Sequence, residues 1–336
     1  MFVLQNGSPI GQVSTARHAS VARMRTLLVL VIVVWLAACA HSPAATSMPP
    51  AACPVAAAAA LPPEDAALRR WKAIVADDFR PPAGTEPAAL VPELVAYLAS
   101  VDPERRDTIA YTVLDRWIGK QVLSAADVHA LVERLVANLR GPLDAPDGVY
   151  GRSFSALVLA SIVERDAAAP VLSDAERRTI LAAARDYAHR ETDLRGHTGE
   201  RGWAHGAAHT ADLLAQLAKL PSLTDDDRAV MLDAVAGFVV RRHGQVLHDG
   251  EDGRLGVAVV AAAKAGLAPP ALAAWLAQIK APLTERFTPK FDAPHYAAYR
   301  NARNLLFTLY VQLSLMPEPS DGQRRLLEAV RTTLAD

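Results

Sequence analysis

The stretch E-T-D-L-R-G-H-T-G-E-R-G-W-A-H-G-A-A-H-T-A-D-L-L-A-Q-L-A-K, residues 191–219, differs from the sequence around it. Its first half gathers glycines, histidines, a tryptophan and charged residues, whereas its second half has apolar residues at helical spacing. The chain on both sides consists mostly of alanine- and leucine-rich segments with the same helical period. The stretch therefore predicts a polar loop that enters one helix of an all-α protein.

The helix that follows this loop carries the strongest candidate site. We expect it to begin near Arg201, and 3.6 residues per turn then place His205, His209 and Asp212 within about 60° of one another on one face. Two histidines one turn apart with a nearby carboxylate suit zinc, and the same groups suit proton transfer. Gly206 stands where the zinc metalloprotease helix has its glutamate, so the sequence does not support that mechanism.

An alternative interpretation of the helix needs no site, because Gln216 and Lys219 continue the polar stripe as a solvated face would. We favour a site because histidine is a poor choice for solubility alone and because the preceding loop is rich in glycine. Trp203 is expected to anchor the start of the helix. Further candidates are Glu200 as a catalytic carboxyl and, for ligand binding, Asp193, Arg195, Trp203, Arg300 and Arg303.

The run D-L-R-G-H-T-G-E-R-G-W-A-H-G-A-A-H-T-A-D, residues 193–212, resembles the signature of a bacterial protein family, the domain of unknown function 2785 (DUF2785). The resemblance covers most of the chain from about Leu68 to the C-terminus. It implies an all-helical fold built like the armadillo or HEAT solenoids, and no assigned activity. A shorter likeness, G-W-x-H-G at residues 202–206, is to the α/α-toroid enzymes.

Helical periodicity begins at Glu64 and continues to the C-terminus, and no stretch reads as a convincing strand. Pro-rich or polar breaks separate the helical segments. The predicted helices are 66–75, 90–98, 108–118, 126–139, 153–165, 174–191, 202–219, 225–242, 253–265, 270–279, 294–315 and 321–334. Short breaks imply stacked antiparallel hairpins, so we expect a single domain, residues 64–336, with an armadillo- or HEAT-like α-solenoid fold. A closed α/α toroid is the alternative.

The composition excludes some classes of partner and cross-link. The 336 residues carry a formal net charge of −1, with no basic stripe and no nucleic-acid motif, so we expect no binding to DNA or RNA. Cys39 and Cys53 are the only cysteines, which excludes a disulfide framework. Cys53 is expected to be a free thiol or to pair with another chain.

The first 39 residues predict a targeting sequence. Arg23 and Arg25 precede the apolar run L-L-V-L-V-I-V-V-W-L, which ends in L-A-A-C at Cys39. This pattern is typical of a bacterial lipobox, in which the cysteine is lipid-modified and becomes the first mature residue. A transmembrane anchor is the alternative, although the run is shorter than the ~20 residues of a spanning helix. Residues 1–23 lack signal character, which makes Met24 a candidate for the true start.

The segment after the lipobox predicts how the domain is attached. Residues 40–63 are almost entirely Ala, Pro, Ser and Thr, the composition of a flexible tether. A palmitate-bearing Cys39 followed by this tether would hold the helical domain at a membrane. Ala40 follows the cysteine, which under the enteric sorting rule predicts the outer membrane. We therefore expect the protein in the bacterial cell envelope, facing the periplasm.

Two later segments are candidates to complete the central site. The acidic loop H-D-G-E-D-G-R, residues 248–254, lies between two helices that we expect to pack near residues 191–219. A solvated turn in which Asp252 caps the next helix is the alternative. Arg300 and Arg303 share a predicted helix face with Tyr296, and such a face suits an anionic or sugar ligand. Interhelical salt bridges are the alternative for these arginines.

Two functions are compatible with these residues. In the first, a lipid-anchored scaffold binds an envelope protein, a peptide or a glycan through a groove lined by the Gly-Trp-His stretch. In the second, an envelope hydrolase or lyase uses His205 or His209 as general base, oriented by Asp212, with Glu200 or Asp193 as a second carboxyl. The sequence has no nucleophile motif, phosphate loop or nicotinamide fingerprint, and we favour the scaffold.

Overall fold

The computed structural model describes residues 65–335, and the structural statements below refer to them. The predicted signal sequence, the lipobox with Cys39 and the tether at residues 40–63 lie outside this range. The described chain is helical along its length, with one isolated antiparallel bridge between His197 and Trp203 and no other β-structure. The prediction of an all-α fold is therefore confirmed.

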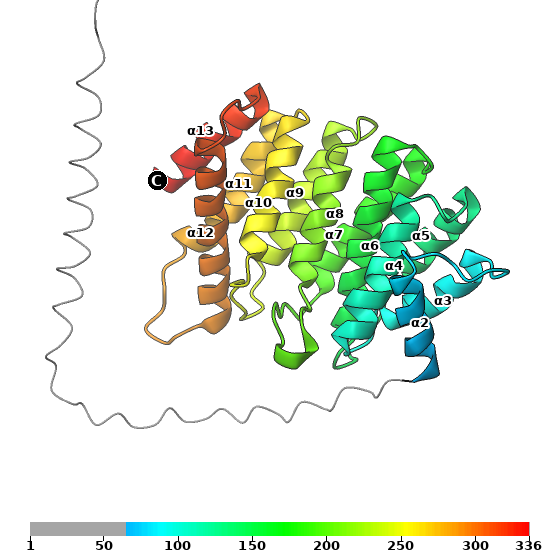
Figure 1. The fold of residues 1–336 in the computed structure, drawn as a ribbon. Coiled ribbons are helices and arrows are strands. Elements are labelled where there is room, and N and C mark those ends of the chain that lie inside the picture. The colour runs from blue at the N-terminus through cyan, green and yellow to red at the C-terminus, as the bar shows by residue number, and fades with distance from the viewer. Residues whose placement is uncertain (1–64, 336) are drawn as a thin grey trace, which may run out of the picture. The chain divides into compact units, whose positions relative to one another are not determined.

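Twelve α-helices, labelled in Figure 1, make up most of the described range. They are α2 (Ala66–Ala76), α3 (Pro87–Tyr97), α4 (Thr112–Gly119), α5 (Ala125–Leu139), α6 (Val149–Ala168), α7 (Asp174–Arg190), α8 (Gly206–Leu217), α9 (Asp225–Val239), α10 (Glu251–Lys264), α11 (Pro269–Thr284), α12 (Ala293–Ser314) and α13 (Asp321–Ala335). A π-helix, η1 (Glu104–Tyr111), precedes α4, and a 3₁₀ turn, η2 (Gly199–Arg201), lies between α7 and α8. Each predicted segment overlaps one of these helices, and the segment 108–118 is divided between η1 and α4.

The helices pack as hairpins in two layers (Figure 1). Helices α6, α8, α10 and α12 pack side by side in one layer, and α5, α7, α9 and α11 pack in the other. Four hairpins, from α5/α6 to α11/α12, therefore repeat along the stack. Helices α2 and α13 lie at opposite ends of the stack, so the stack is open. This is the arrangement of an α-solenoid, whereas a toroid would close on itself.

Local sequence fixes where three helices of one layer begin. In α5, α7 and α9 the N-cap hydroxyl accepts a hydrogen bond from the backbone N–H three residues on, and the carboxylate at that residue accepts from the N-cap N–H. The pairs are Ser124 with Asp127, Ser173 with Glu176, and Thr224 with Asp227.

Long loops gather at one edge of the stack. Figure 1 shows the loops 191–205, 240–250 and 285–292, which connect the two helices of successive hairpins, at its lower edge. Loops held by rigid helices are where binding residues tend to lie. The motif-bearing loop, residues 191–205, is therefore presented beside its neighbours along the stack.

One continuous hydrophobic core runs through the stack from Leu68 to Val330. At its N-terminal end the buried rings of Trp71 and Trp117 lie 6.2 Å apart. A core of this extent gives residues 65–335 the features of an independent folding unit. No helix of this range is long and apolar enough to cross a bilayer.

Candidate functional site

The loop between α7 and α8, residues 191–205, is an ordered hairpin. The Thr198 N–H donates to the Gly202 carbonyl at 2.8 Å, and the Thr198 hydroxyl donates to the same oxygen at 2.6 Å. Gly199 and Gly202 turn the chain with φ values of 70° and 71°, which residues with a side chain rarely adopt. The glycines of the motif thus build the tip of this hairpin, which we call the α7–α8 loop.

His205 ends the α7–α8 loop in a left-handed conformation, with φ 51° and ψ 36°. Helix α8 begins only at Gly206, so the prediction of a helix from Arg201 is wrong, and His205 is the N-cap residue. The hairpin occupies the residues that periodicity alone assigned to the first helical turn. A non-glycine residue in this conformation costs about 1–3 kcal/mol, and such strain clusters at functional sites.

His205 is nearly fully buried, and two side chains enclose its ring. The Trp203 indole stacks on the imidazole with ring centroids 4.2 Å apart. The Glu251 Oε1 atom lies 3.8 Å from Nε2 of His205, and this nitrogen has no hydrogen-bond partner. Burial and the nearby Arg254 lower the pKa of His205, while burial raises the pKa of Glu251. The result is an imidazole that favours its neutral form beside a carboxyl that holds its proton more tightly than usual.

His209 lies in the core and faces α6. Its Nδ1 atom is 2.8 Å from the Ser153 hydroxyl, and its ring packs edge-on against Phe154 with centroids 4.8 Å apart. The same hydroxyl donates to the Ala204 carbonyl, so it joins α6, α8 and the end of the α7–α8 loop. Burial lowers the pKa of His209 well below its usual value, which favours the neutral ring. These contacts give His209 a structural role at the base of the loop.

Asp212 pairs with an arginine of α10 and not with either histidine. Its carboxylate forms an ion pair with Arg254 of α10, and burial raises its pKa despite that pair. Among residues 65–335, no group of three or more His, Cys, Asp and Glu side chains is placed to hold a metal ion. The predicted zinc candidates His205, His209 and Asp212 therefore do not form such a group. The physical reason is the late start of α8, because His205 precedes the helix and the expected one-face spacing is lost.

A buried ion pair that the sequence analysis missed fixes the base of the α7–α8 loop. Arg152 of α6 donates to both oxygens of Glu191, at 2.7 and 3.1 Å, and both side chains are buried. The Glu191 carboxylate also accepts from the backbone N–H groups of Thr192 and Asp193. Bidentate, charge-assisted bonds of this kind are strong and geometrically specific. The signal for the pair was an arginine at the entrance to a largely apolar helix.

Arg106, in the π-helix η1, supports the loop from another side and was also missed. Its fully buried guanidinium donates to the carbonyls of Arg201 and Ser100, at 2.8 and 2.9 Å. It lies 4.3 Å from the centroid of the Tyr150 ring, whose hydroxyl is 2.8 Å from that of Thr198. π-Helical segments are frequent at functional sites. Here the segment carries the arginine that holds the loop tip.

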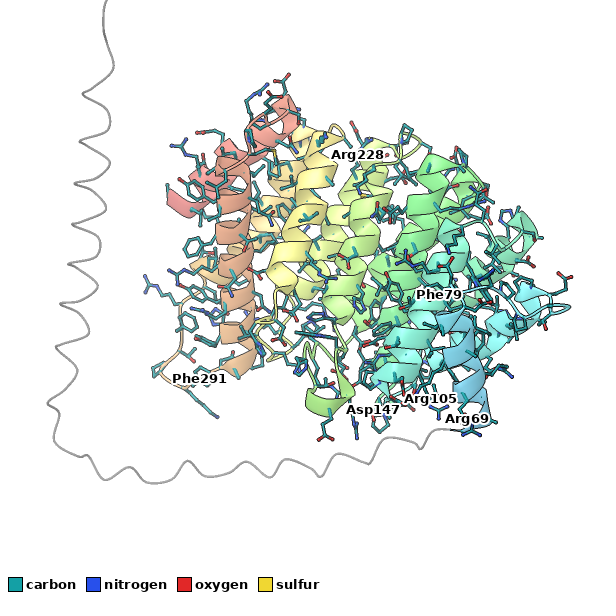
Figure 2. The ribbon with its side chains drawn as sticks, in the orientation of Figure 1. Arg69, Phe79, Arg105, Asp147, Arg228 and Phe291 are labelled. Atoms are coloured by element: carbon teal, nitrogen blue, oxygen red, sulfur yellow. The ribbon has the colours of Figure 1, made fainter. Side chains whose placement is uncertain are left out.

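Charged pairs occupy the rim of the loop. The predicted ligand-binding residues Asp193 and Arg195 bind each other, through Arg195 Nε to Oδ1 at 2.8 Å and Nη2 to Oδ2 at 2.6 Å. Asp147, labelled at the same edge in Figure 2, accepts from Arg201 at 3.0 Å. These bonds to Asp193 raise the pKa of Arg195. Glu200, the predicted catalytic carboxyl, lies in the exposed turn η2.

Trp203 lies at the surface with 40% of its area exposed. It contacts the residue that begins the helix, as expected of an anchor, but it does so from outside the core. The indole does not enter the core but stacks on the N-cap residue, His205. The ring of His197 also lies 4.7 Å away, at a steep angle. The structure thus holds Trp203 in a fixed position and leaves part of the indole open.

The 240–250 loop packs against the α7–α8 loop. Asp249 accepts a hydrogen bond from the His197 N–H at 2.9 Å. The approach at Gly196 leaves no room for a side chain, because a Cβ there would lie 2.0 Å from Asp249 Oδ2. The acidic segment at residues 248–254 therefore does contact the central loop, and it contributes Glu251 to the His205 environment.

The predicted arginine face lies elsewhere, on α12. Arg303 covers the ring of Phe307 at 4.8 Å, and within residues 65–335 neither Arg303 nor Arg300 forms a salt bridge. Salt bridging therefore does not explain these two arginines. Asp252 accepts from the Thr308 hydroxyl at 2.5 Å, so it links α10 to α12 and does not cap α10. Arg300 and Arg303 form a separate surface and do not complete the central site.

Comparison with known proteins confirms the family resemblance of residues 193–212. A family model described as "Protein of unknown function (DUF2785)" matches residues 118–311, a range that includes the whole α7–α8 loop and the 240–250 loop. No curated protein and no solved structure matches the chain.

Proposed function

The chain belongs to the DUF2785 family of proteins of unknown function, and from its site we propose that it is a lipid-anchored protein of the bacterial cell envelope that binds a glycan through Trp203. In this proposal Cys39 carries the lipid and residues 40–63 form the tether. The helical domain acts as a rigid scaffold that presents the α7–α8 loop to the ligand. The outer membrane, with the domain facing the periplasm, is the proposed location.

The observation that carries the proposal is that Trp203 is both exposed and fixed in place. Its indole is 40% exposed, yet it stacks on a nearly buried His205 within a hydrogen-bonded hairpin. Indole offers a large apolar contact area together with an N–H donor. Because the indole is already held in one position, its side chain loses little conformational entropy when a ligand packs on it.

A glycan suits this surface better than a peptide or a protein does. The C–H face of a sugar ring packs on a flat indole, and sugar hydroxyls form hydrogen bonds with charged side chains. Asp147, Arg201 and Glu200 supply such side chains at the rim of the same loop. The Asp147–Arg201 and Asp193–Arg195 pairs balance their own charges, which favours an uncharged ligand over a strongly ionic one.

The anchor is tested by metabolic labelling with radioactive palmitate. We expect the wild-type protein to incorporate the label and to fractionate with outer membranes. Cys39→Ala should lose the label, while Cys53→Ala, the matched control, should keep it. An unlabelled wild-type protein would overturn the anchor and leave the glycan proposal standing.

Glycan binding is tested with soluble, uncharged glycan fragments, oligosaccharides of N-acetylglucosamine, and with tryptophan fluorescence. Trp71, Trp117 and Trp275 are buried, so quenching by iodide should report mainly on Trp203 within the helical domain. We expect the fragments to protect Trp203 from iodide, and Trp203→Ala to abolish binding in calorimetry. Val257→Ala, at another exposed apolar position, is the control and should bind normally. Equal binding by wild type and Trp203→Ala would contradict the proposal.

A second candidate function rests on the pairing of His205 with Glu251. The 3.8 Å approach, the unpartnered Nε2 and the opposite pKa shifts fit a general acid–base pair, with Glu251 in the place predicted for Asp212. If the protein is a hydrolase or lyase, the wild type should cleave the fragments, as detected by mass spectrometry. Glu251→Gln should then lower turnover far more than it lowers binding.

A further inference from the structure

Exposed apolar side chains are concentrated at one end of the stack. Nine large apolar side chains of the described range are strongly exposed, and seven of them lie between Phe287 and Leu315. Phe291, at 70% exposure, is labelled in Figure 2 on the protruding loop 285–292. Soluble monomers rarely expose contiguous apolar patches of this kind, and such patches mark interaction surfaces.

On α12 three exposed aromatic residues and two half-buried arginines form one stripe. At 100° per residue, Tyr296, Arg300, Arg303, Phe307 and Tyr310 fall within about 80° of one another. The remaining sides of the helix pack against α10, α11 and α13. The stripe is therefore the side of α12 that the stack leaves uncovered, and along it two arginines lie between aromatic side chains.

The 285–292 loop continues this stripe. The Phe291 ring lies 5.6 Å from that of Tyr296, and the Phe287 ring lies 5.3 Å from that of Tyr299. We call the loop and the uncovered side of α12 together the α12 face. Its aromatic side chains thus form one surface that begins at the loop tip and follows the helix.

The α12 face carries an excess of positive charge. Arg286, Lys290, Arg300 and Arg303 are present, whereas Asp292 is the only acidic residue between positions 286 and 317. Asp292 lies 3.9 Å from Arg242, which also pairs with Glu285 at the start of the loop. The two carboxylates of the face, Glu285 and Asp292, are therefore paired with an arginine of the neighbouring 240–250 loop. The four cations of the face have no salt-bridge partner in the described range.

We propose that the α12 face docks the helical domain onto the surface of an anionic phospholipid bilayer. Phenylalanine and tyrosine side chains enter the boundary between headgroups and acyl chains, and arginine and lysine bind the phosphates above them. Each cation at an anionic surface strengthens binding by a small, additive amount. Docking of this kind is separate from glycan binding, because the α12 face contains no residue of the α7–α8 loop.

A second copy of the chain fits the face less well. A symmetric dimer would bring the same patch of both subunits together and so place the four cations of one against the four of the other. Like charges in contact oppose association. A bilayer containing phosphatidylglycerol presents both an apolar layer for the aromatic side chains and negative charge for the cations of the face.

The test uses the helical domain, residues 64–336, so that neither leader nor lipid anchor contributes to binding. Binding is measured by cosedimentation with vesicles of phosphatidylglycerol or of phosphatidylcholine. We expect clear preference for phosphatidylglycerol. Arg300→Gln with Arg303→Gln should weaken this binding about 30-fold, the combined effect of losing two cations near an anionic surface. Phe287→Ser with Phe291→Ser should weaken it tenfold or more.

Matched controls separate docking from general effects of charge or polarity. Arg69→Gln with Arg134→Gln removes the same charge from exposed positions outside the α12 face, and Val257→Ser removes an exposed apolar side chain outside it. Both controls should bind the vesicles as the wild type does, and all variants should keep the wild-type melting temperature. Equal binding to both lipids, or equal losses in variants and controls, would overturn the proposal. A dimer on gel filtration that Phe287→Ser with Phe291→Ser dissociates would assign the face to a second copy.

Discussion

The base and the tip of the α7–α8 loop are built from the same short motif but differ in almost every physical property. At the base, Glu191 and His209 are buried, and each is bonded to a side chain of α6. At the tip, Trp203 and Glu200 are exposed. The comparison teaches that polar residues crowded in a motif need not share one role. Those at the base hold the loop, and those at the tip are free to meet a ligand.

The largest effect should come from breaking the ion pair at the base. Arg152→Ala leaves the Glu191 carboxylate buried without its partner, so we expect the free energy of unfolding in urea to fall by about 3–5 kcal/mol. Arg178→Ala on α7, which removes a half-exposed arginine 3.5 Å from Asp227, is the control and should cost less than about 1 kcal/mol. Similar losses of unfolding free energy in both variants would mean that the buried pair at the base stabilises the protein no more than a surface pair does.

The contact between the α7–α8 loop and the 240–250 loop should give the next largest effect. Gly196→Ala would place a Cβ 2.6 Å from that of Asp249, and overpacking of this kind costs about 1–3 kcal/mol. Gly253→Ala in α10 meets no atom within 4 Å and should stabilise the protein by up to about 1 kcal/mol. Both changes can be measured by thermal melting. An unchanged melt for Gly196→Ala would mean that the 240–250 loop moves aside.

The buried His209 should make stability depend on pH. Because its pKa is lowered in the folded state, its contribution is complete above the unfolded value of about 6.5 and is lost as the pH falls below it. We expect the free energy of unfolding to decrease from pH 7.5 to pH 5, and to decrease less in His209→Gln. Glu251, whose pKa is raised, changes the free energy of unfolding with pH in the opposite direction, but this effect is present in both the wild type and His209→Gln. Parallel pH profiles would place His209 in contact with water.

The smallest effect on folding should come from the tip. Trp203→Ala removes one aromatic stack from a partly exposed site, so we expect a loss of only about 1 kcal/mol in urea unfolding. The same variant should lose glycan binding. A loss of binding with little loss of stability would distinguish the tip of the loop from its base. A loss of 3–5 kcal/mol, the cost of deleting a core tryptophan, would mean that Trp203 belongs functionally to the base.

The candidate site was only partly predictable. The sequence identified the correct loop, because glycines, histidines and a tryptophan together are unusual in an alanine-rich helical chain. It misplaced His205 on the face of α8, because the residue's left-handed conformation follows from a hairpin that no helical period reveals. It paired the histidines with Asp212, whereas the carboxylate that reaches His205 is Glu251 of the next hairpin.

The sequence by itself determined the all-helical class and several helix starts, because apolar periodicity and capping act over a few residues. Only the tertiary structure decided which side chains meet in the site. Arg152 reaches Glu191 across 39 positions, and Arg106 reaches the carbonyl of Arg201 across 95. Such contacts depend on how the hairpins stack, and the stacking is set by packing of the whole core. Local patterns therefore fixed the elements, whereas the site arose from distant residues that the stack brings together.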